Sequence, residues 1–368
     1  QYVEELTDKE LVEKALNGML QALDPHSSYM NEEVYKEMQM DTSGTFGGLG
    51  IEITTDKGFI KIISPIDDTP ADKAGIQAGD YITHLNGESV VDMNLKEAID
   101  IMRGEVGTPI TITIIRGAEE PFDVELVRDT IKMASVKHRV LNNVGVLRVS
   151  TFNEQTTSGL KDSIKELEES DNPPIGYVLD LRNNPGGLLT ESVSVSDLFL
   201  EQGEIVSIRG REKKDVQVYT AKKGDLINKK PLVILINEGS ASASEIVAGA
   251  LQDHDRAVIM GMKSFGKGSV QTIVPIDSGA IRLTIAKYYT PSGDSIQAVG
   301  IEPDVVVPRA ELNIIDNYFT FRESDYKDAL DNETTNGDEE EATSTDILEQ
   351  DYQLSRAVDA VKTIAVLN

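Results

Sequence analysis

The 368-residue chain contains no cysteine and no tryptophan, and only four histidines. Without cysteine, the chain has neither disulfides nor thiolate metal sites. Basic residues are also scarce, because 35 Lys and Arg stand against 63 Asp and Glu, for a net charge of −28. A chain this acidic repels polyanions, so nucleic acid and anionic membrane surfaces are poor partners.

Several longer patterns are missing as well. No apolar run is long enough to span a membrane, and no secretory signal peptide is recognisable. The chain starts at Gln1 rather than Met, so we expect that an upstream segment has been removed. No G-x-S-x-G motif occurs, which argues against an α/β-hydrolase. The length leaves room for two to three domains.

The most informative pattern present is a run of small residues at 239–244, between an apolar run at 231–236 and a helix-like segment at 243–252. This order predicts a strand, a tight turn and a helix, with Ser242 at the helix N-terminus. Free backbone N–H groups at that position favour a developing oxyanion, as an acyl-transfer nucleophile requires. The alternative is that Ser242 and Glu245 form an S-x-x-E capping box without chemistry.

A nucleophilic serine needs a base. His254 lies twelve residues further along the same predicted helix, roughly 18 Å away, and cannot reach Ser242. Lys267, flanked by Gly266 and Gly268, could serve if burial lowers its pKa from about 10.4 by roughly three units. The alternative for Lys267 is an ordinary surface lysine in a glycine loop.

The same loop resembles an incomplete nucleotide-binding motif. Gly261, Gly266 and Lys267 have P-loop spacing, but Gly268 replaces the hydroxyl residue that binds magnesium. Residues 269–274 alternate like a strand, whereas a P-loop opens a helix. Nucleotide binding therefore remains only a weak rival hypothesis.

A second turn follows the apolar run at 175–179. The segment 183–187 reads Asn-Asn-Pro-Gly-Gly and is typical of a turn that needs glycine. It is either a plain strand-to-helix connection or a group of N–H donors that face a reacting carbonyl. For Asp180 and Arg182, beside this turn, we expect a structural role.

Residues 46–115 show a second, β-rich module. A glycine-rich loop at 46–50 enters an alternating strand, Asn86-Gly87 indicates a tight hairpin, and 95–102 reads as a helix. This order resembles a PDZ domain, which implies that Gly48, Leu49, Gly50 and Ile51 form the loop that binds a peptide carboxylate. A β-rich insertion without a ligand is the alternative.

Several motifs together resemble the carboxyl-terminal processing (tail-specific) serine proteases. They cover roughly residues 20 to 310 in the order of that family: Leu-Asp-Pro-His-Ser (23–27), Leu-Asp-Leu-Arg-Asn-Asn-Pro-Gly-Gly (179–187), Gly-Ser-Ala-Ser-Ala-Ser-Glu-Ile (239–246), Phe-Gly-Lys-Gly-Ser-Val-Gln (265–271), Tyr-Thr-Pro-Ser-Gly (289–293) and Gly-Ile-Glu-Pro-Asp (300–304). Each motif alone is weak, but the ordered set is specific.

The resemblance implies a role for individual residues. It assigns Ser242 as the nucleophile, Lys267 as the general base and Gln271 as the group that orients the lysine. It places the oxyanion donors at the backbone N–H of Ala243 and at one of Gly186 and Gly187. The histidines become bystanders, and neither a metal nor an organic cofactor is expected.

The expected fold is α/β and multidomain, with a crotonase-like protease core of sheet and helices that the resemblance implies, and an inserted PDZ domain. We expect a helical segment at 1–44, the PDZ domain at 45–130, the protease core at 131–310 and a C-terminal region at 311–368. Within the last, 332–346 reads as an acidic linker. A terminal helix follows, which docks either on its own core or on another subunit.

The predicted function is a Ser–Lys endopeptidase whose PDZ domain binds free C-terminal tails and which cleaves unfolded or flexible proteins near those tails. The alternative is a catalytically silent PDZ scaffold. The resemblance further implies a periplasmic or otherwise extracytoplasmic bacterial location, and a homodimer. A regulatory partner protein is a further candidate.

Overall fold

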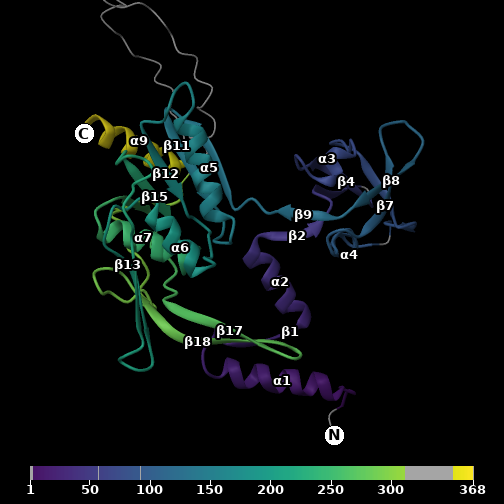
Figure 1. Cartoon of the computed structure of the whole chain (residues 1–368), viewed down its shortest axis with the longest axis horizontal. Helices are drawn as coiled ribbons and strands as arrows, with labels where there is room; N and C mark the ends of the chain where they lie inside the picture. The colour runs from purple at the N-terminus through teal and green to yellow at the C-terminus, as the bar shows by residue number, and fades with distance from the viewer. Residues whose placement is uncertain (1–2, 57, 92, 311–350, 368) are drawn as a thin grey trace, which may run out of the picture.

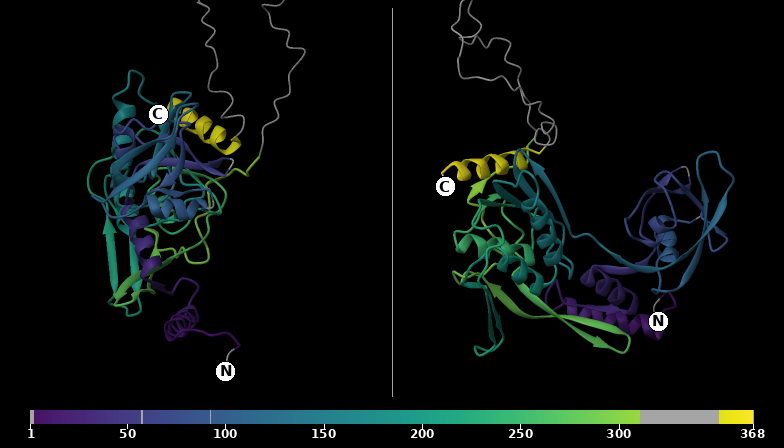
Figure 2. Two further views of the ribbon diagram at one scale, coloured as in Figure 1. Left: turned by 90° about the vertical axis from the view of Figure 1, so that its right-hand side faces the viewer. Right: turned by 45° about the horizontal axis from the view of Figure 1, so that its top comes forward.

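The structure is a computed structural model that describes residues 3–56, 58–91, 93–310 and 351–367. Two bodies are visible in Figure 1: a large α/β core on the left and a smaller β-rich module on the right. Figure 2 shows the same separation from two other directions. The acidic linker predicted at 332–346 lies outside the described residues.

The large body is built on a six-stranded sheet with the order β10-β11-β12-β15-β16-β19. All neighbours are parallel except the antiparallel pair β10 and β11. The strands are β10 (Val136–Leu141), β11 (Val144–Val149), β12 (Gly176–Asp180), β15 (Leu232–Ile236), β16 (Val258–Gly261) and β19 (Val305–Val306). The central strands β12 and β15 are buried along their whole length, as their continuous apolar sequences predict.

Helices cover both faces of this sheet. On one face, α5 (Thr156–Glu168), α6 (Leu189–Asp197) and α7 (Ala243–Asp253) enclose a core that includes Leu179, Ile234 and Val247. On the other face, α9 (Tyr352–Leu367) packs against alternate residues of the same strands, among them Val178 and Val233. The terminal helix therefore docks on its own core.

A second sheet carries the N-terminal segment. It has the order β1-β18-β13-β14, and β17 also pairs with β18. Its strands are β1 (Ser28–Asn31), β13 (Glu204–Gly210), β14 (Val216–Thr220), β17 (Ser269–Ile276) and β18 (Gly279–Tyr289). β17 follows the Lys267 loop directly, so the predicted strand at 269–274 is confirmed. Because a P-loop is followed by a helix, this loop is not a P-loop.

One helix, α2 (Glu32–Ser43), and a short ladder link the bodies, and α1 (Asp8–Gln21) packs on β1 before them. α1 begins with the capping box of Thr7 and Glu10, and α2 follows β1. The chain then enters the β-rich module through β2 (Thr45–Gly48) and leaves it through β9 (Asp129–Lys132), and these two strands pair antiparallel. The module is thus an insertion that starts and ends at one ladder.

The module itself is a sheet with the order β3-β4-β5-β7-β8, with β6 paired to β5. Its elements are β3 (Ile51–Asp56), β4 (Phe59–Pro65), α3 (Pro70–Lys73), β5 (Tyr81–Leu85), β6 (Glu88–Ser89), α4 (Leu95–Met102), β7 (Pro109–Ile115) and β8 (Phe122–Val127). Asn86 and Gly87 join β5 to β6 with φ values of 50° and 83°, as a tight Asn-Gly hairpin requires. The predicted fold class, an α/β multidomain protein with an inserted β-rich domain, is confirmed.

Candidate active site

Ser242 lies in the turn between β15 and α7, at the carboxyl edge of the parallel sheet. Its backbone has φ 55° and ψ −111°, an uncommon conformation for a residue with a side chain. The residue is only 5% exposed, and its Oγ forms a 3.0 Å hydrogen bond with Tyr288 Oη. Burial raises the pKa of Tyr288, so this phenol stays protonated at neutral pH.

The Asn-Pro-Gly-Gly turn after β12 lies directly against Ser242. A Cβ added to Gly186 would lie 2.7 Å from Ala241 O and 2.8 Å from Ser242 Cβ, so only glycine fits there. Asn184, fully buried, joins the two turns, because its backbone O accepts hydrogen bonds from Ala241 N–H and Ser244 Oγ. The two turns therefore form one rigid unit.

The three predicted oxyanion donors differ in what their N–H groups already bind. Gly186 N–H donates to Asn184 Oδ1 at 2.9 Å and is thus occupied. The N–H groups of Gly187 and Ala243 donate to no acceptor among the described residues. Gly187 and Ala243 are therefore the donors that remain open to a substrate oxygen.

Lys267 is half-buried in the loop before β17. Burial lowers the pKa of its ammonium group, and the nearby Arg282 lowers it further, while Glu245 opposes the shift. Its Nζ forms no hydrogen bond or ion pair with any residue that the structure describes. A lysine in this setting releases its proton more readily than a surface lysine does.

Glu245 connects the nucleophile to the base, a role that the sequence did not reveal. Its Oε2 accepts the backbone N–H of Ser242 at 2.7 Å and that of Lys267 at 2.9 Å. Its Oε1 accepts Ser264 Oγ and Gly266 N–H, each at 2.6 Å. The capping-box reading was thus correct for the Glu245 half, but this fully buried carboxylate also fixes the lysine loop.

Gln271 lies on the same wall of the site but does not contact Lys267 through a hydrogen bond in this structure. Its Nε2 donates to Ser269 Oγ at 2.9 Å and to Thr284 Oγ1 at 3.1 Å. Ser242 and Lys267 are likewise not hydrogen-bonded to each other, and the serine hydroxyl bonds to Tyr288 instead.

One cavity nevertheless collects the predicted groups. It has a volume of about 600 Å³, and its walls come from α2, the two turns, the lysine loop and the β17–β18 hairpin. Its lining includes Ser242, Lys267, Gln271, Gly186, Gly187 and Tyr288. The structure thus brings the predicted catalytic side chains to the lining of one cavity, next to the open N–H donors.

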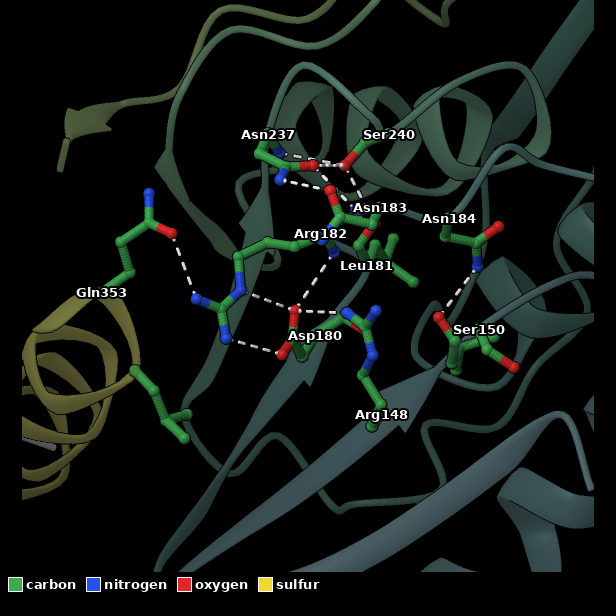
Figure 3. A network of polar contacts seen from close by, with 12 residues as sticks. Arg148, Ser150, Asp180, Leu181, Arg182, Asn183, Asn184, Asn237, Ser240 and Gln353 are labelled. Atoms are coloured by element: carbon green, nitrogen blue, oxygen red, sulfur yellow. Dashed lines mark hydrogen bonds and ion pairs between the residues drawn. The ribbon is translucent and has the colours of Figure 1, made fainter. Parts of the chain in front are cut away.

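A second cavity, of about 910 Å³, opens at the same sheet edge beside α9. There Asp180 accepts hydrogen bonds from Arg148 and Arg182 (Figure 3). Arg182 also binds Asp351 at 2.7 Å. Gln353 adds a contact to Arg182 from α9. The expectation that Asp180 and Arg182 are structural agrees with these contacts.

The predicted peptide loop of the β-rich module borders a small groove of about 140 Å³. Gly48, Leu49, Gly50 and Ile51 form one side of this groove, and α4 forms the other. Gly50 has a φ of 77°, which favours glycine. In addition, a Cβ at this position would lie 2.3 Å from Thr69 Cβ, so there is no room for a side chain. The Arg103 guanidinium covers the Phe46 ring at the same groove, 4.4 Å from its centroid.

Three further features concern His254, metal-binding clusters and membrane-spanning helices in the part of the chain that the structure describes. His254 ends α7 and contacts Glu204 O at 2.7 Å, far from the serine end of the helix. No group of acidic or histidine side chains suited to a metal ion occurs within residues 3–56, 58–91, 93–310 and 351–367. In the same ranges, every helix is too short or too polar to cross a bilayer.

Comparison with known families matches residues 143–307 to Peptidase family S41 and residues 61–116 to the PDZ domain. Residues 1–34 match the N-terminal domain of the activating protease CtpB. The solved structure of a photosystem II D1 C-terminal processing protease is 30% identical with a TM-score of 0.50, over 83% of this chain and 84% of that one.

Two curated relatives carry the same name. A carboxy-terminal-processing protease of Bartonella bacilliformis is 57% identical over 311 residues, which are 83% of this chain and 72% of the relative. The carboxy-terminal processing protease CtpA of Bacillus subtilis is 38% identical over 314 residues, or 84% of this chain and 66% of that protein. These matches confirm the predicted resemblance, and they do not favour the silent scaffold. The chain belongs to the carboxy-terminal processing proteases of peptidase family S41, which are serine peptidases with a PDZ domain.

Proposed function

We propose that the chain is a Ser–Lys endopeptidase in which Ser242 is the nucleophile and Lys267 the general base. The observation that carries the proposal is a shared cavity. It is lined both by a lysine with a lowered pKa and no partner among the described residues and by a buried serine at a helix N-terminus. A neutral amine can accept the serine proton, whereas an ordinary surface ammonium cannot.

The proposed reaction begins when the Ser242 hydroxyl exchanges its bond to Tyr288 for one to Lys267 Nζ. Ser242 Oγ attacks the scissile carbonyl while Lys267 takes its proton, and the N–H groups of Ala243 and Gly187 stabilise the oxyanion. Gly186 would contribute only if its N–H left Asn184 Oδ1. Lys267 then protonates the leaving amine, and water hydrolyses the acyl-enzyme.

Gln271 is proposed to orient Lys267. Its side chain lines the same cavity, and its Nε2 is committed to Ser269 and Thr284. The amide oxygen Oε1 forms no hydrogen bond with a described residue, which leaves it able to accept an N–H of the lysine.

The substrate is proposed to be an unfolded or flexible protein whose free C-terminal tail binds the groove of the PDZ domain. The supporting features are the loop of Gly48, Leu49, Gly50 and Ile51 and the adjacent cation Arg103. Backbone N–H groups of such a loop bind a terminal carboxylate, and the peptide adds as a strand to the sheet edge. We assign 45–130 to this domain, 131–310 to the protease core, 1–44 to the N-terminal helical segment and 311–368 to the C-terminal region.

The first experiment compares the purified chain with Ser242→Ala and Lys267→Ala on an unfolded protein with an apolar C-terminus, with products identified by mass spectrometry. Lys263→Ala is the matched control, because Lys263 lies on the same loop, is half-exposed and pairs with Glu302, away from the cavity lining. Both active-site variants should lose cleavage by at least about a thousandfold, as in other enzymes that lose a nucleophile or base. Cleavage by Lys267→Ala at the parent rate would rule out the lysine as base.

Tail recognition is tested with two peptides that differ only in a free or an amidated C-terminus. The free peptide should bind more tightly and be cleaved with a lower KM, since amidation removes the charge that the loop binds. Equal KM values would exclude carboxylate recognition. Binding of the free peptide without cleavage by the parent chain would revive the scaffold alternative.

We also propose a homodimer, because α1 exposes a row of apolar side chains to solvent: Leu11, Val12 and Met19, with Leu23 just beyond. Exposed apolar rows of this kind are typical of interaction surfaces. Sedimentation of the parent and of Met19→Glu should give a dimer and a monomer; two monomers would contradict the proposal. A regulatory partner protein and an extracytoplasmic location remain predictions from the family resemblance, to be checked by co-purification and by cell fractionation.

A further inference from the structure

A polar chain of contacts leads from the catalytic cavity to the N-terminal turn at 24–27. Gln271 Nε2 donates to Thr284 Oγ1 at 3.1 Å, and Thr284 Oγ1 donates to Asp24 Oδ1 at 3.1 Å. Gln271 and Thr284 face each other across the β17–β18 ladder. Asp24 is thus joined through Thr284 to a residue that lines the cavity, although it precedes Gln271 by more than half the chain.

The turn that holds Asp24 is itself firmly anchored. Asp24 Oδ1 accepts the N–H groups of His26 and Ser27, and Oδ2 accepts Ser27 Oγ at 2.7 Å. Ser27 is buried, and its Oγ also accepts the backbone N–H of Thr284 at 3.1 Å. These contacts fix the position of the carboxylate relative to β18.

The Asp24 carboxylate is charged at neutral pH. Burial alone would raise its pKa, but the hydrogen bonds from Ser27, His26 and Thr284 outweigh burial and hold the pKa below its usual range. An ionised carboxylate can only accept hydrogen bonds. The single proton of the Thr284 hydroxyl must therefore point toward Asp24.

This direction determines the orientation of the Gln271 amide. With its proton committed to Asp24, Thr284 Oγ1 offers Gln271 only lone pairs, so the glutamine must present its NH₂ group to Thr284. Its oxygen Oε1 then points away from Thr284 and stays free to accept from an amine. If Thr284 donated to the glutamine instead, the amide would turn and offer N–H groups to a lysine that also carries N–H groups.

We propose that Asp24 and Thr284 are positioning residues of the protease: they fix the Gln271 amide so that its oxygen accepts a hydrogen bond from Lys267. The proposal rests on the proposed Ser–Lys function. The Lys267 amine, held through one N–H, would aim its lone pair at Ser242. Other titratable or charged groups near the lysine are Arg282 on β18, Glu245 on α7 and His26 in the N-terminal turn. Both oxygens of Glu245 already accept hydrogen bonds from other groups.

The test uses three threonine variants of the full chain. Thr284→Val keeps the shape but removes the hydroxyl, and Thr284→Ser restores it. Thr272→Val is the matched control, because Thr272 lies next to Gln271 on β17, is half-buried, and does not line the cavity. We expect kcat to fall about tenfold in Thr284→Val, the loss of one orienting hydrogen bond, and to stay within about twofold of the parent in the other two.

A purely structural role is separated by a double-mutant cycle and by KM. If Thr284 acts through Gln271, Thr284→Val should change nothing further in a Gln271→Ala background, and KM should stay constant throughout. Additive effects, a change in KM alone, or full activity of Thr284→Val would overturn the proposal. Melting temperatures of every variant identify any that unfold.

The same assay includes Ser242→Ala and Lys267→Ala, so that the two proposals fail in different ways. If Lys267→Ala is inactive and Thr284→Val matches Thr272→Val, the positioning role is wrong and the Ser–Lys function stands. If Lys267→Ala remains active, both are overturned, because no lysine base needs orienting.

Discussion

Two cavities open at the carboxyl edge of the same sheet, one on each face. The cavity beside α9 is the larger, about 910 Å³ against about 600 Å³, and it contains more charge. Its central charges neutralise one another, since Arg182 binds both Asp180 and Asp351. In the smaller cavity, by contrast, Lys267 Nζ and the Gly187 N–H have no partner among the described residues, and neither has the Ala243 N–H next to it. The cavity proposed as reactive is therefore distinguished by a buried serine at a helix N-terminus next to open backbone N–H donors, rather than by size or charge.

Among variants that keep the Ser242 and Lys267 side chains, the largest expected effect comes from adding a Cβ at Gly186, beside the smaller cavity. In Gly186→Ala the new Cβ would press on Ala241 O and Ser242 Cβ, at a φ of 101° that alanine resists. We expect kcat/KM to fall roughly a hundredfold or more, because the nucleophile and the oxyanion donors lose their mutual geometry. Initial rates on an unfolded substrate measure this.

Gly293→Ala is the control for Gly186→Ala. Gly293 has a φ of 89°, yet nothing lies within 4 Å of an added Cβ. The alanine in Gly293→Ala therefore imposes backbone strain of about 1 to 2 kcal/mol without a steric clash. If both variants lose activity equally, strain alone explains the loss and the contact with Ser242 is irrelevant.

The next largest effect is on stability and concerns the cavity beside α9. Arg182→Met removes ion pairs to Asp180 and Asp351 and leaves the mostly buried Asp180 with fewer partners. The free energy of unfolding should fall by about 3 kcal/mol, as expected when one partner of a buried pair is removed. Catalysis should be affected much less, in contrast with Gly186→Ala.

Urea denaturation of Arg182→Met measures that loss. Lys165→Met provides the comparison, since the exposed pair of Lys165 and Glu169 should contribute less than about 0.5 kcal/mol. Equal stability of the two variants would show that the ion pairs beside α9 do not hold the terminal helix.

A smaller effect is a change in pH dependence at Lys267. Activity that needs the neutral amine should rise with pH through the lysine pKa, which burial and then Arg282 hold below its ordinary value. In Arg282→Gln the repulsion is removed, the pKa rises, and the acid limb of kcat/KM should move to higher pH. Activity at pH 7 should then drop a few-fold. An unchanged profile, or a shift to lower pH, would contradict this coupling.

The smallest expected effect is a gain in stability. Since the Lys267 pKa is lower in the folded chain, the folded state binds fewer protons there than the unfolded state between the two pKa values. The unfolding free energy therefore rises with pH in that range, and at lower pH the buried ammonium is a cost. Lys267→Met should raise Tm at neutral pH by at most a few degrees while it abolishes activity. A lower Tm would show that the ammonium stabilises the fold.

The sequence predicted the helices and strands that surround the proposed site, but it did not predict the side-chain contacts that join them. Apolar runs and turn residues predicted β12, β15 and α7, because burial on both faces gives strands a continuous apolar pattern. Local spacing also predicted the capping role of Glu245. It could not predict that the other oxygen of that carboxylate binds the lysine loop, because this contact depends on tertiary packing.

The same limit applies to Gln271 and Asp24. The motif at 265–271 indicated that Gln271 belongs to the site, but its bonds to Ser269 and Thr284 depend on how β17 pairs with β18. The motif at 23–27 was recognised without a role, since nothing in its spacing connects it to a strand near residue 284. The occupied N–H of Gly186 likewise required the side-chain position of Asn184.

The contact between Asp24 and Thr284 joins residues 260 positions apart in the chain. On the ribosome the N-terminal turn is therefore complete long before the hairpin that it must meet has been synthesised. Closing so long a loop is slow compared with local folding. If the glutamine depends on this contact, a growing or truncated chain carries its serine and lysine without their full alignment. Such a protease would acquire its activity last, when little of its own chain is still unfolded and open to attack.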